Sequence, residues 1–214
     1  MVIEVGPREV LLLWPNVICY VRAVLGAFAL GLAWWPEIPM LTWVVAIYAF
    51  AMSLDFLDGY LARRWQQQSR FGAALDVVVD IAQRGGMWVL ALNLPGFLFP
   101  LVELNVFACT HSSGSESWKV TCFEDAPMLV AAVTSNVFKS PCGALMVAGL
   151  HFLPLWLWLR QRTSASFPGF NLVGFLLCSG RLLGLVVEFW VLKRHVEGLL
   201  RPIDALTIRS CAHV

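Results

Sequence analysis

The chain has 214 residues, of which 59% are apolar and only 14% are charged. Soluble domains carry about 25% charged residues, so this chain lacks the polar surface that a water-soluble enzyme needs. The formal net charge of +1 and the absence of basic clusters exclude the electrostatic footprint of a nucleic-acid-binding protein. The composition therefore predicts a single integral-membrane domain, residues 1–214.

Charged residues, prolines and glycines divide the chain into segments of membrane-spanning length. A transmembrane helix needs about 20 mainly apolar residues, and six segments come close to that length. We expect helices over residues 11–35, 38–62, 72–94, 96–112, 140–159 and 170–192. The predicted fold class is an all-α membrane protein with six transmembrane helices.

The second and third segments contain acidic residues that a lipid-facing helix should not carry. Asp55 and Asp58 are three positions apart, and Asp76 and Asp80 are four apart, so each pair shares one face of its helix. An ionised Asp at the bilayer centre costs about 2.5–3.5 kcal/mol even on a lenient scale, so four of them need compensation. Carboxylate oxygens are preferred ligands of Mg²⁺ and Mn²⁺. The spacing therefore predicts a metal site.

The alternative interpretation is that these aspartates cap helices or form ion pairs with Arg63, Arg64 and Arg84 near the membrane surface. Small residues around the acids favour the metal site, because they let two helices approach closely and leave room for a ligand. These residues are Gly59, Ala62, Gly72, Ala73 and Ala74.

The last segment carries a central arginine. Arg181 lies in the middle of the span, where an arginine should face a polar cavity or a charged partner. Glu188 follows seven residues later on nearly the same helix face and is the candidate partner. Gly180 and Gly184 have the spacing of a close contact between helices.

The basic residues gather at one end of the predicted bundle. With six spans, both termini lie on the same side of the membrane as most lysines and arginines. The positive-inside rule places that side in the cytosol. The residues on it are Arg63, Arg64, Arg70, Lys119, Lys139, Lys193, Arg194 and Arg201, against Arg160 and Arg162 on the other side.

The spacing of the acids and glycines resembles a known signature at all eight fixed positions, through Asp55-x2-Asp58-Gly59-x2-Ala62-Arg63-x8-Gly72-x3-Asp76-x3-Asp80. The signature is that of the CDP-alcohol phosphatidyltransferases. The resemblance implies a six-helix membrane enzyme, usually a homodimer, in which a hydroxyl acceptor displaces CMP from a CDP-alcohol.

Roles for individual residues follow from this resemblance. It implies two divalent ions, Mg²⁺ or Mn²⁺, held by Asp55, Asp58, Asp76 and Asp80, with Asp80 also acting as the general base. It implies binding of CDP-diacylglycerol by Asn16, Gly59, Ala62, Arg63 and Gly72. Asn16 has a second interpretation as a helix N-cap. Arg22 is either a phosphate contact or a side chain that extends to the membrane surface.

Within the family, the closest likeness is to the eukaryotic phosphatidylinositol synthases. It is carried by residues 15–22, 70–76 and 111–119. It implies transfer of a phosphatidyl group from CDP-diacylglycerol to myo-inositol, giving phosphatidylinositol and CMP, in the endoplasmic reticulum or the Golgi. That branch has Arg directly after the fourth Asp, where this chain has Ile81. We expect Arg84 to take its place, with His111 and Lys119 as further acceptor-binding residues.

Other functions remain open at this point. Glycerol 3-phosphate or serine is the alternative acceptor for the same chemistry. A non-catalytic membrane scaffold descended from the enzyme is an alternative of another class, and so is a carrier of cations or nucleotides. The four intact aspartates argue against a scaffold, since a scaffold gains nothing from charges that are so costly to bury.

Overall fold

A computed structural model describes residues 6–35, 38–111, 122–123, 125–164 and 168–200. The described part of the chain is helical and contains no strand. Its elements are α1 (Pro7–Leu11), α2 (Trp14–Trp34), α3 (Ile38–Arg64), α4 (Arg70–Leu92), the short 3₁₀ helix η1 (Leu94–Phe97), α5 (Leu98–His111), α7 (Met128–Phe138), α8 (Pro141–Arg162) and α9 (Pro168–Leu199). The all-α prediction is therefore confirmed.

Five helical segments of the described chain are long and apolar enough to cross a membrane. They are Trp14–Trp34, Met40–Arg64, Leu94–His111, Pro141–Arg162 and Pro168–Leu199. The expected span that is missing from these five, residues 72–94, corresponds to α4, which has 23 residues and a length of about 35 Å, sufficient for a bilayer core of about 30 Å. Asp76, Asp80 and Arg84 interrupt the apolar character of α4, so length and composition alone do not identify it as a span. The count of five is therefore one short of the expected six.

The element α7 was not expected from the sequence. Its backbone leaves the helical conformation at Ser135 and has positive φ angles of 51°, 55° and 62° at Asn136, Val137 and Phe138. The chain turns there and enters α8, whose first turn is capped by Ser140: its Oγ accepts a hydrogen bond from the Gly143 amide (3.0 Å). The turn places the Phe138 side chain beside the cavity described below.

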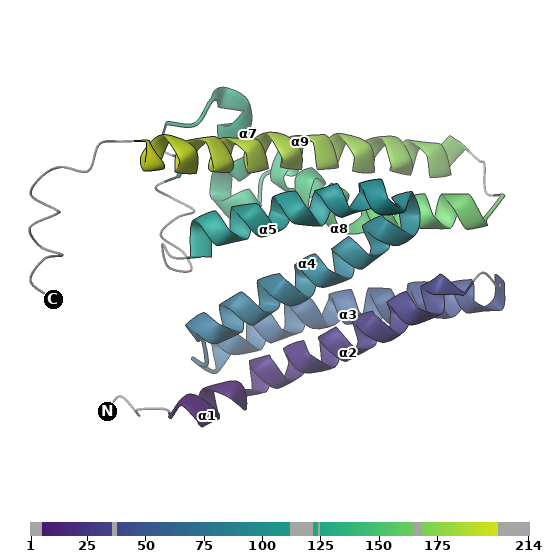
Figure 1. The fold of residues 1–214 in the computed structure, drawn as a ribbon, viewed down its shortest axis with the longest axis horizontal. Helices are drawn as coiled ribbons and strands as arrows, with labels where there is room; N and C mark the ends of the chain where they lie inside the picture. The colour runs from purple at the N-terminus through teal and green to yellow at the C-terminus, as the bar shows by residue number, and fades with distance from the viewer. Residues whose placement is uncertain (1–5, 36–37, 112–121, 124, 165–167, 201–214) are drawn as a thin grey trace, which may run out of the picture.

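The long helices run roughly side by side, with α4 between two groups (Figure 1). It contacts α2 in one group, and α5 and α8 in the other. The beginnings of α2 and α4 and the ends of α3, α5 and α9 lie at the same end of the bundle, and η1 and the beginning of α9 lie at the opposite end. This alternation agrees with six consecutive crossings.

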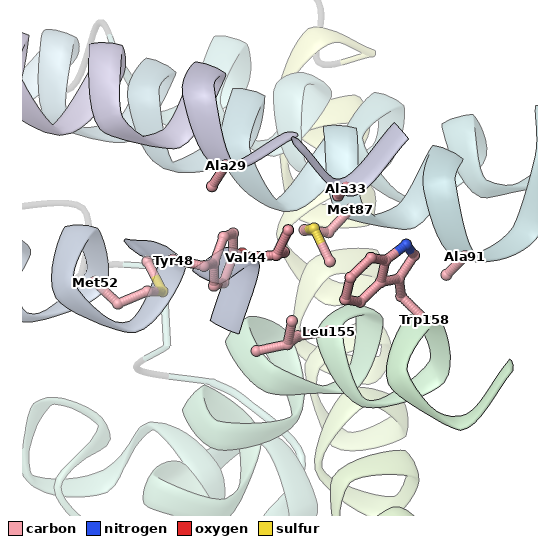
Figure 2. Packing of buried hydrophobic residues seen from close by; sticks show 9 residues of the cluster. All are labelled: Ala29, Ala33, Val44, Tyr48, Met52, Met87, Ala91, Leu155 and Trp158. Atoms are coloured by element: carbon pink, nitrogen blue, oxygen red, sulfur yellow. The ribbon is translucent and has the colours of Figure 1, made fainter. Parts of the chain in front are cut away.

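A buried apolar cluster fixes α4 against its neighbours (Figure 2). Met87 and Ala91 of α4 pack there with residues of α2, α3 and α8: Ala29, Ala33, Val44, Tyr48, Met52, Leu155 and Trp158. The helices α8 and α9 approach each other through glycines, because a Cβ at Gly180 would overlap the carbonyl of Leu145. The expected helix contact at Gly180 therefore lies within the chain, between α8 and α9.

Candidate metal centre and adjoining cavity

The start of α4 is held close to α2. The Ser69 hydroxyl caps α4 by accepting a hydrogen bond from the Gly72 amide (2.9 Å). A Cβ at Gly72 would overlap Oδ1 of Asn16, so the glycine leaves room for the Asn16 side chain between the two helices. The packing places Asp76 and Asp80 opposite Arg22, in the first half of α2.

The four aspartates predicted to bind metal converge in the structure. The carboxylate oxygens of Asp55, Asp76 and Asp80 lie within 4.8 Å of one another. Asp58 and Asp76 form a second set of this kind with the thiol of Cys19. Asp76 belongs to both sets, and its side chain is 42% exposed while that of Asp58 is only 7% exposed. Oxygen ligands at this spacing fit a hard divalent ion such as Mg²⁺ or Mn²⁺.

Arg22 of α2 lies at the centre of this carboxylate cluster, a position that the sequence did not predict. Its Nη1 atom lies 2.9 Å from Asp55, 2.7 Å from Asp58 and 2.7 Å from Asp76. Its Nη2 atom lies 2.5 Å from Asp80. The side chain is fully buried and turned inward, so it does not extend to the membrane surface.

The residues expected to bind the donor surround one side of the cluster. A Cβ at Gly59 would contact only the guanidinium of Arg63, which leaves open space above this turn of α3. Arg63 is exposed and forms no ion pair with the described residues. Ala62 follows Asp58 by one turn and is half-buried.

Asn16 is not a helix N-cap, because the N-cap of α2 is Leu13 and Asn16 is the third residue of the helix. Its Nδ2 donates to the Val10 carbonyl (2.6 Å), and its Oδ1 faces Gly72. Asn16 therefore connects α1, α2 and α4 at the edge of the site.

A second polar network begins at Asp80. Arg84 Nη1 donates to Asp80 (2.9 Å), while its Nε and Nη2 donate to Glu103 of α5 (3.0 and 2.8 Å). His151 of α8 lies 3.0 Å from Arg84 and 3.6 Å from Asp80 through its Nε2 atom. Its Nδ1 faces the Val147 carbonyl (2.9 Å), which can only accept, so Nδ1 carries the hydrogen and Nε2 accepts from Arg84.

The network continues into α9. Arg181 Nη1 donates to both carboxylate oxygens of Glu188 (3.1 and 3.0 Å), which confirms the predicted pair. Arg181 also lies 3.9 Å from Glu103. Sequence reasoning missed the roles of Glu103 and His151, although an acidic residue inside the fourth predicted span is itself a signal of a polar interior.

A cavity of about 390 Å³ lies next to the cluster. Its apolar lining comes from α4, α5, α8, α9 and Phe138 at the end of α7, and Asp76 and Arg84 connect it to the carboxylates. The exposed ring of His111 lies at its wall, in contact with Phe107. Lys119 lies outside the described residues. The charged side chains that line the cavity are Arg70, Asp76, Arg84, Glu103 and Glu188.

The arrangement brings a carboxylate cluster and a cavity together in one place. Converging carboxylates suit a cation that neutralises and polarises a diphosphate. A mainly apolar cavity of this size with a few charged groups suits a small molecule held beside that diphosphate. The guanidinium of Arg84 belongs to both parts, since it contacts Asp80 and lines the cavity.

Comparison with known proteins agrees with this chemistry. The sequence profile of the CDP-alcohol phosphatidyltransferase family matches residues 12–167. This range covers most of the described helices and includes all four aspartates of the cluster. No solved structure matches the chain.

Similar proteins are named CDP-diacylglycerol–glycerol-3-phosphate 3-phosphatidyltransferases. The protein of Yersinia enterocolitica is 46% identical over 54 residues, which are 25% of this chain and 27% of that protein. The protein of Pectobacterium atrosepticum is 48% identical over 54 residues, with the same shares. The protein of Pseudomonas fluorescens is 35% identical over 92 residues, 38% of this chain and 46% of that protein. The chain thus spans less than half the length of these relatives.

These names differ from the acceptor expected from the sequence, because they refer to glycerol 3-phosphate and not to inositol. The relatives are also bacterial, so they give no support to a location in the endoplasmic reticulum or Golgi. The comparisons agree with the expected chemistry at the level of the family. With the profile matching residues 12–167, the chain belongs to the CDP-alcohol phosphatidyltransferase family.

Proposed function

We propose that the protein transfers a phosphatidyl group from CDP-diacylglycerol to a hydroxyl of a small alcohol and releases CMP. The observation that carries this proposal is the position of four carboxylates beside a cavity of about 390 Å³ that reaches Asp76 and Arg84. The cluster is suited to the diphosphate of the donor, and the cavity is suited to the acceptor.

Asp55, Asp58, Asp76 and Asp80 are the residues that would hold Mg²⁺ or Mn²⁺ in this proposal. The ions would neutralise the diphosphate and stabilise the charge on the departing CMP. Asp80 is oriented by Arg22 on one oxygen and by Arg84 on the other. It would accept the proton of the acceptor hydroxyl while that oxygen bonds to phosphorus and the bond from phosphorus to CMP breaks.

The donor would lie over the end of α3 and the start of α4. The open turn at Gly59 gives room for the nucleotide, and Arg63 supplies an unpaired positive charge within the described chain. Gly72 and Asn16 define the edge of the space on α4 and α2. We place this side of the protein in the cytosol because Arg63, Arg64 and Arg70 gather there, and we propose a homodimer from the family resemblance.

Glycerol 3-phosphate is the first candidate acceptor. The similar proteins reported above carry this compound in their names. The cavity also offers a cation for a phosphate group, because Arg70 lines it and forms no ion pair with the described residues. A guanidinium can bind phosphate through two parallel hydrogen bonds.

Myo-inositol is the second candidate, and the polar lining of the cavity suits it. Three carboxylates line the cavity, those of Asp76, Glu103 and Glu188, and each is paired with a guanidinium, that of Arg22, Arg84 or Arg181. An uncharged polyol would meet these paired groups with hydroxyls that both donate and accept hydrogen bonds.

The test is an assay on the purified protein in detergent micelles. CDP-diacylglycerol and Mn²⁺ or Mg²⁺ are supplied with glycerol 3-phosphate, myo-inositol or serine in turn, and CMP release and the lipid product are measured. A product from one acceptor and none from the others identifies the substrate. Absence of CMP release with every acceptor and both ions would overturn the proposed function and favour a non-catalytic scaffold.

A further inference from the structure

Arg22 is the one described cation that reaches every carboxylate of the cluster. Its two terminal nitrogens lie 2.5–2.9 Å from Asp55, Asp58, Asp76 and Asp80. The cluster contains four negative charges, and acids this close would repel one another strongly without a cation between them. Among the described residues, Arg22 supplies that cation.

The position of Arg22 is fixed by the fold. Gln83 of α4 donates a hydrogen bond from Nε2 to the backbone carbonyl of Arg22 (2.8 Å). Gly26, one turn further along α2, leaves the space for this side chain, because a Cβ there would overlap Gln83. The contact holds the backbone of α2 against α4 at the level of Asp80.

Arg22 uses the same carboxylates that a divalent ion would use. Its Nη1 atom contacts three aspartates that belong to the two potential metal-binding sets. A divalent ion within reach of these oxygens would therefore lie close to a guanidinium of the same sign of charge. Like charges placed next to each other at a partly buried site oppose binding. The ion must displace the guanidinium from some of these oxygens or bind against its repulsion.

We infer that Arg22 is a positioning residue that holds the carboxylates together in the metal-free protein and competes with the divalent ion for them. The inference rests on the proposed metal-dependent function. It goes beyond that function because it predicts that the protein weakens its own metal site. The competition makes ion binding depend on another anion that can attract Arg22, such as the diphosphate of the donor.

The experiment measures Mn²⁺ binding to the full chain in detergent without donor, by electron paramagnetic resonance of free Mn²⁺. Arg22→Gln should bind Mn²⁺ with a Kd about tenfold lower than the unchanged protein, because the competing charge is gone. Arg64→Gln is the matched control, since Arg64 is exposed at the end of α3 and forms no ion pair with the described residues. Its Kd should equal that of the unchanged protein. Adding Asp76→Asn to Arg22→Gln should weaken binding again, which locates the ion at the cluster.

The outcomes separate the two proposals. If the unchanged protein binds Mn²⁺ and Arg22→Gln binds it no more tightly, the competition is wrong and the proposed function stands. If neither protein binds Mn²⁺ at millimolar concentration, the metal site itself is wrong. Should Arg22→Gln fail to fold, Arg22→Lys replaces it: a lysine cannot contact four carboxylates at once, so its Kd should fall about threefold. An unchanged or higher Kd for Arg22→Lys would then overturn the inference.

Discussion

Arg84 and Glu103 form a buried ion pair that joins α4 to α5 inside the membrane-spanning part of the bundle. The Nε and Nη2 atoms of Arg84 lie 3.0 and 2.8 Å from the same oxygen of Glu103. Only 5% of Arg84 and 7% of Glu103 is exposed. The third nitrogen of the guanidinium donates to Asp80. The ion pair therefore also holds Asp80 beside the wall of the cavity, which Arg84 lines.

Loss of the Glu103 charge should destabilise the fold strongly. Glu103→Gln leaves the guanidinium of Arg84 without a full counter-charge on its α5 side, and breaking a buried pair costs about 3–5 kcal/mol. Thermal unfolding in detergent measures the effect. Glu197→Gln is the control, because it removes a carboxylate that pairs with Lys193 on the exposed surface (3.6 Å). Such a pair contributes about 0–1 kcal/mol. Equal melting temperatures for the two variants would contradict this account.

The sequence predicted the parts of the site that depend on helical spacing. Asp55 with Asp58, Asp76 with Asp80, and Arg181 with Glu188 are each separated by about one or two helical turns, so their shared faces follow from periodicity. Their charges are unusual in a span, which made them visible. The helical fold class follows from composition for the same reason.

The remaining features depend on contacts between distant segments. From the sequence, Arg22 was explained either as a phosphate contact or as a side chain that extends to the membrane surface. Its place among the acids depends on the packing of α2 against both α3 and α4. Glu103 and His151 meet Arg84 from two other helices. The turn at the end of α7 uses Val137 and Phe138 with positive φ angles, which neither residue type favours, so local propensity gave no sign of it.

Removal of one carboxylate should abolish catalysis without preventing membrane insertion. Asp76→Asn keeps the shape of the side chain but removes a charge that belongs to both potential metal-binding sets. CMP release from CDP-diacylglycerol should fall to background, and EDTA should have the same effect on the unchanged protein, reversed by Mn²⁺ or Mg²⁺. Asp125→Asn, an exposed acid before α7, should retain full activity. Full turnover in chelator would contradict the metal-assisted mechanism.

The membrane orientation makes a separate prediction. Gln68 lies between α3 and α4, next to the basic residues, and Ser164 lies after α8 at the opposite end of the bundle. In a chain whose native cysteines have been replaced, Gln68→Cys should react with a membrane-impermeant maleimide from the cytosolic side. Ser164→Cys should react only after the membrane is opened. Reaction of both from the same side would contradict the arrangement in which α4, α5 and α8 each cross the membrane.

Arg70 should distinguish the two candidate acceptors. It lies at the first turn of α4, lines the cavity and forms no ion pair with the described residues, so it is free to bind a phosphate. A charge-assisted hydrogen bond contributes about 1.5–3 kcal/mol, so Arg70→Gln should raise the KM for glycerol 3-phosphate by a factor of about 10–100. The KM for CDP-diacylglycerol should stay the same. Arg64→Gln removes an equal charge six residues away that does not line the cavity, and it should leave both constants unchanged.

If Arg70→Gln has no effect on the KM for glycerol 3-phosphate, the phosphate of this acceptor is not bound at this end of the cavity. A protein that uses inositol should be insensitive to the same change, because an uncharged polyol gains little from an exposed guanidinium at the cavity wall.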